Sequence, residues 1–271
     1  MRKERNTMMN TPQQIAELYA EAGVFKTKLS TCHTLLLAFF AGMFIAFGAV
    51  GSQIASCLVT DPSAARMLSA VVFPVGLLMV LIAGAELFTG NCLLTLSCLD
   101  KRIKLTAMLR NWVLVYLGNF IGGVFLAWML TYSHTLSLFD GKLAQLVVNT
   151  ATTKVHLSFY DAFLRGILCN LLVCLAVWIS FAAKDVTGKV VGMFFPTMVF
   201  VLSGYEHCIA NMYFIPAGLF TSAEYGIAAD GLTWGAFFIQ NLIPVTLGNI
   251  LGGAMIGAGY YLVYLSKKKG C

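Results

Sequence analysis

The chain has 271 residues, of which 59% are hydrophobic and 11% charged, and its formal net charge at pH 7 is +6. Its mean hydropathy of +0.80 exceeds what the core of a soluble domain needs, so we expect an integral membrane protein with several spans. The polar first thirty residues lack the short apolar stretch of a cleaved signal peptide.

A helix is predicted to begin ahead of the first apolar segment. Thr11 is a suitable cap, Pro12 suits the first helical position, and Gln14 completes a capping box. The next apolar residues share one face of this helix, whereas the charged residues fall elsewhere: Ile15, Leu18, Tyr19 and Ala22 against Glu17, Glu21 and Lys26. We therefore expect an amphipathic helix at the cytoplasmic membrane surface.

Six apolar segments are long enough to span a bilayer: about 32–57, 67–99, 107–132, 159–183, 189–217 and 235–265. The predicted fold is therefore an all-α integral membrane protein with six transmembrane helices. The expected domains are a cytoplasmic segment, a channel domain with two halves, and a basic cytoplasmic tail: 1–30, then 31–266 (halves about 31–135 and 159–265), then 267–271.

The basic residues set the orientation. With the N-terminus inside, fourteen of the 18 Lys and Arg residues face the cytoplasm. The remaining four lie outside or near the outer ends of spans: Arg66, Lys142, Lys154 and Arg165. The positive-inside rule then places both termini in the cytoplasm and the protein in the cytoplasmic membrane. Topology accounts for the net charge, so we expect the lipid bilayer and no nucleic acid as partner.

Two pairs of segments show an internal repeat. Residues 85–91 and 204–211 each place a Glu and a Gly in an apolar run, and Glu86 and Glu206 are 120 positions apart. Gly118–Gly123 matches Gly248–Gly253 in the same way. Three spans per half is an odd number, so the repeat must be inverted, with the second and fifth spans interrupted near the bilayer middle.

Glycines and prolines explain the interruptions. Gly84, Gly90 and Gly204 let the backbone leave helical geometry, and Pro74 and Pro196 each remove a hydrogen-bond donor upstream. Broken backbone at this depth must be packed in protein or line a cavity, and the polar residues at the breaks favour a cavity.

The glycine-rich stretches of spans three and six have a different expected role. The i, i+4 spacing of these glycines is typical of close helix contact in lipid: Gly118, Gly122, Gly248 and Gly252. Asn119 and Asn249 are expected to tie helices together. The eight cysteines contain no CxxC pair and are interpreted as core residues, so we expect no metal, disulfide framework or cofactor.

Three stretches together resemble the formate/nitrite transporter family over nearly the whole chain: Ala85–Thr89, Leu168–Trp178 and Gly204–Met212. The resemblance implies an aquaporin-like protomer, a homopentamer with one pore per subunit, and passage of small monovalent anions of weak acids. Met212–Pro216 is similar to formate-type and hydrosulfide-type members, whereas Phe88–Gly90 and Ser203–Tyr205 are also similar to nitrite-type members. Formate is favoured, with nitrite and hydrosulfide as alternatives.

His207 is the only histidine expected deep in a span, and an imidazole can donate a hydrogen bond or a proton. Together with Thr89 it could hold an anion between the breaks, as the resemblance implies; the alternative is a packed histidine without solute contact. Glu86 and Glu206 would repel an anion, so they are expected to face away from the pore as supporting residues. Asn170 and Asn211 are weaker candidates for ligands that fix the breaks or the histidine.

The resemblance also supplies a constriction: Phe73, Leu77, Leu87, Phe88 and Phe200. An apolar ring passes a neutral acid more easily than an anion. Lys154 in the outer connection matches a vestibule lysine of the family, which would draw anions inward; a solvated lysine is the alternative. Packing against lipid or core is the alternative for each aromatic residue.

Three other readings stay open. A membrane enzyme with a metal at Glu86, Glu206 and His207 is poor in ligands, since no HExxH spacing exists. A neutral-solute channel would share the fold, but neither break carries an Asn-Pro-Ala signature. A purely structural membrane protein would leave His207 and the doubled breaks without a role. We therefore expect a channel rather than an enzyme.

Overall fold

The computed structural model describes residues 9–266, so the first eight residues and the predicted basic tail 267–271 lie outside the described range. Within that range the chain is helical, with only an isolated bridge between Met9 and Ala183. Five stretches are long and apolar enough to cross a membrane: Thr31–Ser56 (α2), Pro62–Gly84 (α3, α4 and the π-helical turn η1), Leu105–Tyr132 (α7), Phe159–Ser180 (α9) and Trp234–Leu265 (α12, η3, α13 and η4). The all-α multi-pass fold is confirmed.

Both predicted interruptions are present. The second span passes from α3 (Pro62–Val72), α4 (Val75–Met79) and η1 (Val80–Gly84) to α5 (Phe88–Asn91) and α6 (Leu94–Leu99). The fifth span is divided into α10 (Val186–Leu202) and α11 (Cys208–Tyr225). Residues 85–87 and 203–207, which separate these helices, are non-helical and are called here the first and second break.

The connection between the halves contains a helix that the sequence did not predict. After the short turn η2 (Thr135–Ser137), α8 (Lys142–Val155) packs against α11. Its buried residues recur every four positions, which is the signal that could have found it: Leu143, Val147, Ala151 and Val155. Helix α8 carries Lys154 and so brings a charged side chain to the second break.

Helix α1 (Pro12–Lys28) begins with the predicted capping box, in which Thr11 accepts from the Gln14 amide and Gln14 accepts from the Thr11 amide. Ile15 and Tyr19 are buried, as expected of the apolar face, but Leu18 is 40% exposed. Lys26 points toward the protein, not toward the polar face that the sequence predicted, because Glu86 pairs with it. Helix α1 is therefore packed on the bundle at the first break.

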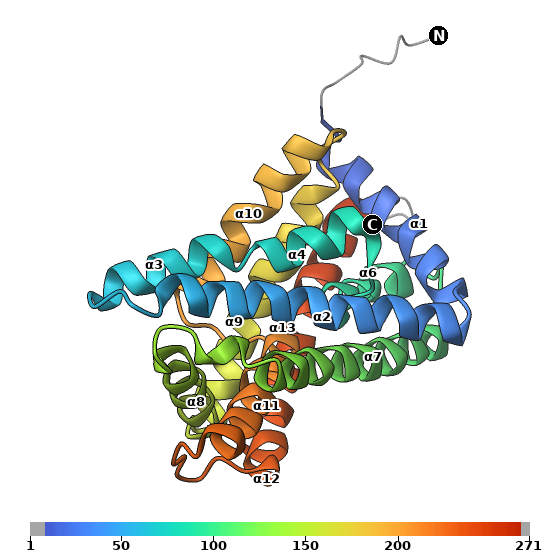
Figure 1. The fold of residues 1–271 in the computed structure, drawn as a ribbon. Helices are drawn as coiled ribbons and strands as arrows, with labels where there is room; N and C mark the ends of the chain where they lie inside the picture. Colours follow the sequence, from blue (N-terminus) through green and yellow to red (C-terminus); the bar gives the residue numbers. More distant parts are fainter. Residues whose placement is uncertain (1–8, 267–271) are drawn as a thin grey trace, which may run out of the picture.

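Within each half, two long helices pack closely along a row of glycines, called here a glycine seam. Helix α2 runs beside α7 across the front of Figure 1, and α9 packs against α13 in the same way. A Cβ added to Gly122 would lie 2.0 Å from the Phe39 carbonyl oxygen, and one added to Gly248 would lie 2.2 Å from that of Phe163. The predicted close contact of these glycines is confirmed, since no larger residue fits.

This packing gives a testable difference between glycines. Gly122→Ala and Gly248→Ala should each destabilise the protein by about 1–3 kcal/mol, because the added methyl group meets backbone that cannot yield. Gly259→Ala is the matched control, since nothing lies within 4 Å of its Cβ position and alanine favours the helix. Thermal denaturation in detergent would measure all three; equal stability of all variants would contradict the seam.

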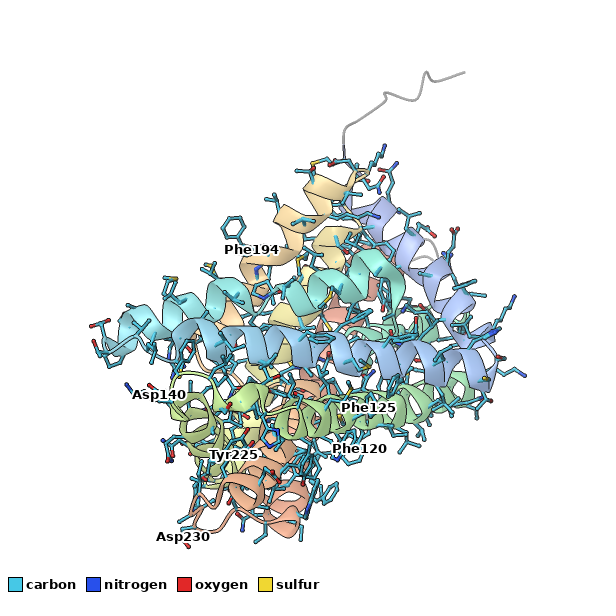
Figure 2. All side chains as sticks on the ribbon, in the orientation of Figure 1. Phe120, Phe125, Asp140, Phe194, Tyr225 and Asp230 are labelled. Atoms are coloured by element: carbon cyan, nitrogen blue, oxygen red, sulfur yellow. The ribbon has the colours of Figure 1, made fainter. Side chains whose placement is uncertain are left out.

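The outside of the bundle is also apolar. Side chains project from every helix (Figure 2), and on α7 the exposed ones recur every three to four residues: Leu109, Val113, Leu117, Ile121, Phe125 and Trp128. An apolar surface of this kind faces lipid or neighbouring subunits in a membrane protein. The buried polar residues are concentrated instead around the two breaks.

Candidate pore site

The backbone of each break depends on one glycine. Gly84 has a φ of 85° and Gly204 a φ of 68°, in the left-handed region that favours glycine. Gly90, which was also predicted to break the helix, lies inside α5 and is helical, so that prediction is wrong. Pro74 separates α3 from α4, and Pro196 lies inside α10.

Asn119 and Asn249 hold the two breaks by the main chain. Asn119 donates to the Glu86 and Ala38 carbonyls at 2.9 and 2.7 Å and accepts from the Phe88 amide at 2.9 Å. Asn249 repeats this at the second break with the Glu206 and Gly166 carbonyls and the Cys208 amide, at 3.0, 2.7 and 2.9 Å. Their predicted role of tying helices together is confirmed.

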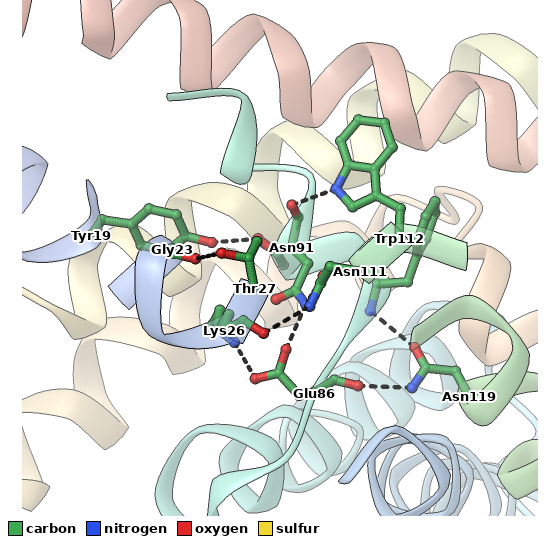
Figure 3. A network of polar contacts seen from close by, with 11 residues as sticks. Tyr19, Gly23, Lys26, Thr27, Glu86, Asn91, Asn111, Trp112 and Asn119 are labelled. Atoms are coloured by element: carbon green, nitrogen blue, oxygen red, sulfur yellow. Dashed lines mark hydrogen bonds and ion pairs between the residues drawn. The ribbon is translucent and has the colours of Figure 1, made fainter. Parts of the chain in front are cut away.

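A buried polar cluster surrounds Glu86 (Figure 3). The Lys26 ammonium lies 2.6 Å from one carboxylate oxygen, and Asn91 donates to the other at 2.7 Å. Asn91 also donates to Asn111 at 2.9 Å, and its carbonyl accepts from the indole of Trp112. Every oxygen of the carboxylate thus has a partner.

The same cluster recurs at the second break. Lys154 lies 2.8 Å from one Glu206 oxygen, Asn211 donates to the other at 2.7 Å, and Asn211 donates to Asn241 at 2.7 Å. Asn241 donates in turn to the Lys154 carbonyl at 2.9 Å. The side chain of Glu206 is 6% exposed and that of Lys154 is 15% exposed, so the pair is largely withdrawn from water.

The two clusters show which partners the predicted residues Glu86, Glu206 and Lys154 have. The carboxylate groups of Glu86 and Glu206 accept from lysine and asparagine, and neither contacts His207. Lys154 is not a free solvated lysine. Lys26, Asn111 and Asn241 were not predicted, although Lys26 is seven residues after Tyr19 on the same helix face, and the two asparagines are 130 positions apart, like Asn119 and Asn249.

His207 and Thr89 join the two breaks. The Nε2 atom of His207 lies 2.8 Å from the Thr89 hydroxyl oxygen, and both residues are buried. His207 also caps α11, because its Nδ1 accepts from the Ala210 amide at 3.0 Å. Since an amide can only donate, Nδ1 carries no proton here, and the neutral ring carries its proton on Nε2.

Two cavities approach this pair from different sides. The larger, about 550 Å³, is lined by Phe73, Phe200 and His207. The smaller, about 320 Å³, is lined by Leu77, Leu87 and the backbone around Gly90. No residue of the described range 9–266 lines both. Thr89 itself lines neither cavity. Its neighbours Leu87 and Gly90 line the smaller cavity and its hydrogen-bond partner His207 lines the larger, so the Thr89–His207 pair lies between the two cavities.

The wall between the cavities is apolar. The Phe73 and Phe200 rings meet edge to face with centroids 5.5 Å apart, and the Phe200 ring stacks on the His207 imidazole at 5.8 Å. These rings and the two leucines leave the imidazole and the Thr89 hydroxyl as the hydrogen-bonding side chains at the wall. An ion crossing such a layer loses much of its hydration.

Of three further predicted residues, only Phe88 takes another position than expected. Phe88 lines neither cavity and packs against Trp112 and Tyr116, with ring centroids 6.1 and 4.9 Å apart. Asn170 donates to the Thr89 and Asn249 carbonyls at 3.2 and 2.6 Å, which agrees with its expected role of fixing the chain beside the breaks, and it lines neither cavity. Asn211 lines the larger cavity but donates to Glu206 and Asn241.

The fold and this site define a class of protein: a membrane channel or transporter for a small solute. The chain belongs to the formate/nitrite transporter family, whose sequence model matches residues 13–263. It is 37% identical over 277 residues to a probable formate transporter of Methanothermobacter thermautotrophicus, which covers 95% of this chain and 98% of the relative. It is 42% identical over 213 residues to the formate channel FocA of Haemophilus influenzae, with 74% and 75% covered.

Solved structures agree with the sequence relatives. A pentameric formate channel with formate bound superposes with a TM-score of 0.76 at 34% identity, covering 87% of this chain and 98% of that one. An FNT family ion channel superposes with a TM-score of 0.83 at 29% identity, covering 92% and 98%. The expected family is therefore confirmed over nearly the whole chain.

Proposed function

We propose that this protein is a homopentameric channel, not an enzyme, that passes formate and similar small monovalent anions across the cytoplasmic membrane, with both termini inside. The names of its relatives and the pentameric structural neighbour support the substrate and the assembly. The distribution of basic residues supports the orientation. In this orientation the larger cavity faces outward and the smaller one, beside α1, faces the cytoplasm.

The observation that carries the proposal is the hydrogen bond between Thr89 and His207 across the cavity wall. With its proton on Nε2, His207 donates to the Thr89 oxygen, and this leaves the Thr89 hydroxyl hydrogen free to donate to an anion. The ordered sequence of donors, from the Ala210 amide through the imidazole to the hydroxyl, polarises the last donor. The pair therefore offers one strong donor where hydration is lost.

This geometry distinguishes two roles of His207 toward an anion: donating a proton and donating a hydrogen bond through Thr89. To give a proton, His207 would have to be protonated at Nδ1 as well, and the Ala210 amide occupies that position. The pair therefore acts as a hydrogen-bond donor in this state, and a proton that neutralises formate comes from water in the cavities. An apolar wall then passes formic acid, or formate held by a hydrogen bond, far more readily than the bare anion.

Transport in proteoliposomes tests the substrate. We expect formate uptake to exceed nitrite and hydrosulfide uptake, and glycerol to be excluded, because the wall offers a donor for an acid anion and no row of polar groups for a polyol. The measurement compares the four solutes across pH in vesicles with and without protein. Glycerol flux without anion flux would contradict the proposal in favour of a neutral-solute pore, and equal nitrite flux would broaden the substrate.

A further inference from the structure

The two cavities differ in charge. The larger is lined by Arg66, Lys154, Arg165 and Glu206, which gives a formal charge of +2. The smaller is lined by Lys26 and Glu86, which cancel. Within residues 9–266 these are all the charged residues that line either cavity. Since Lys154 is paired with Glu206, the excess positive charge of the larger cavity comes from the two arginines.

Arg66 lies against the second break. Its Nη1 atom is 2.7 Å from the position that a Cβ of Gly204 would occupy, so the missing side chain of that glycine makes room for the guanidinium group. The residue extends from α3, in the other half of the protein. Its guanidinium forms no ion pair or hydrogen bond with any described residue, so its donors are available to a solute.

Arg165 is fixed to the same break from α9. Its carbonyl oxygen accepts from the Glu206 amide at 3.3 Å, while its exposed side chain has no ion-pair partner among residues 9–266. The matching position of the first half is a leucine, so the backbone contact that Arg165 makes does not depend on a guanidinium group. At the first break the Leu37 carbonyl accepts from the Glu86 amide, also at 3.3 Å, and there a leucine lines the smaller cavity.

The geometry points to an anion-capture site formed by Arg66 and Arg165 at the larger cavity, upstream of the Thr89–His207 pair. Two unpaired guanidinium groups in a partly enclosed cavity raise the local concentration of anions. Guanidinium donors also match the two oxygens of a carboxylate, which makes small monocarboxylates such as formate the favoured class of ligand. This inference rests on the proposed function and assigns the recruiting role to the arginines instead of Lys154.

A variant that removes both charges tests the site. The variant combines Arg66→Gln with Arg165→Leu. Leucine is chosen at position 165 because Leu37 occupies the matching position of the first half. At low ionic strength and low formate concentration, the formate current in planar bilayers should fall about tenfold. At saturating formate the current should match that of the parent, because capture supplies ions and does not change the wall. Added impermeant salt should lower the parent current toward that of the variant.

The control is Lys142→Gln, which removes an exposed charge of the same side of the membrane that lines neither cavity. It should leave the current at low formate within about twofold of the parent. The inference is overturned if the double variant equals the parent at low formate and low salt, or if saturating formate does not restore its current. Absence of formate uptake by the parent in proteoliposomes would instead contradict the proposed function, so the two failures are distinguishable.

Discussion

Replacing His207 by Asn should lower the formate current about 10- to 100-fold while the protein stays folded. Asparagine is a good helix cap and can still accept from the Ala210 amide, but it is too short to reach Thr89. The variant thus removes the donor to the hydroxyl group together with the imidazole ring that stacks on Phe200, while it keeps the helix cap. A hydrogen bond to a charged group contributes about 1.5–3 kcal/mol, which corresponds to that loss of rate.

Thr89→Val provides the matching variant, because valine keeps the shape and removes the hydroxyl. If the two residues act as one donor, the single variants and the double variant should show nearly the same current, as expected for coupled residues. Currents would be measured against pH for all three, with thermal denaturation to confirm folding. An unchanged current and pH profile in His207→Asn would refute the role of the pair.

The second large effect is expected in stability. Glu206→Ala should lower the free energy of unfolding by up to about 3 kcal/mol, because it leaves the largely buried Lys154 ammonium without its partner. Replacing both residues, Glu206→Ala with Lys154→Met, should cost less, since no uncompensated charge remains. The two variants would be compared by thermal denaturation of the purified oligomer.

The transport activity of the same two variants shows whether Lys154 acts as a structural partner of Glu206 or as a charge that attracts anions. If Lys154 mainly balances Glu206, the double variant should retain the current of the parent within about twofold, because removing one positive and one negative charge leaves the net charge of the larger cavity unchanged. A single Glu206→Ala variant as stable as the parent would show that the pair does not hold the second break.

Local rules were enough to predict the framework from the sequence. Gly122 and Gly248 were identifiable because only small residues allow helices to approach so closely, and the i, i+4 spacing states this directly. The breaks were identifiable because Gly84 and Gly204 stand beside charged residues in apolar runs, a combination that a continuous span does not tolerate. Gly90 satisfied the same rule by composition, yet its conformation is set by α5 around it.

Contacts between distant segments were beyond these rules. Lys26 and Glu86 belong to different helices, and nothing local distinguishes a lysine that pairs from one that marks the cytoplasmic side. Phe88 was predicted in the constriction from the family resemblance, but the structure packs it against Trp112 and Tyr116. The repeat itself is the best guide to such contacts, since each cluster at one break has its counterpart at the other.

The side chains of Asn119 and Asn249 form hydrogen bonds only with main-chain atoms at the breaks. This bears on how the side chains at the breaks can change in evolution. Leu87 and His207 occupy equivalent places in the two halves, and both are carried by the same peptide framework although one is apolar and the other a donor. Side chains at these places can change without loosening the support beneath them. An ancestral duplicated gene could therefore diversify what its product admits through a handful of point substitutions, while the architecture is inherited intact.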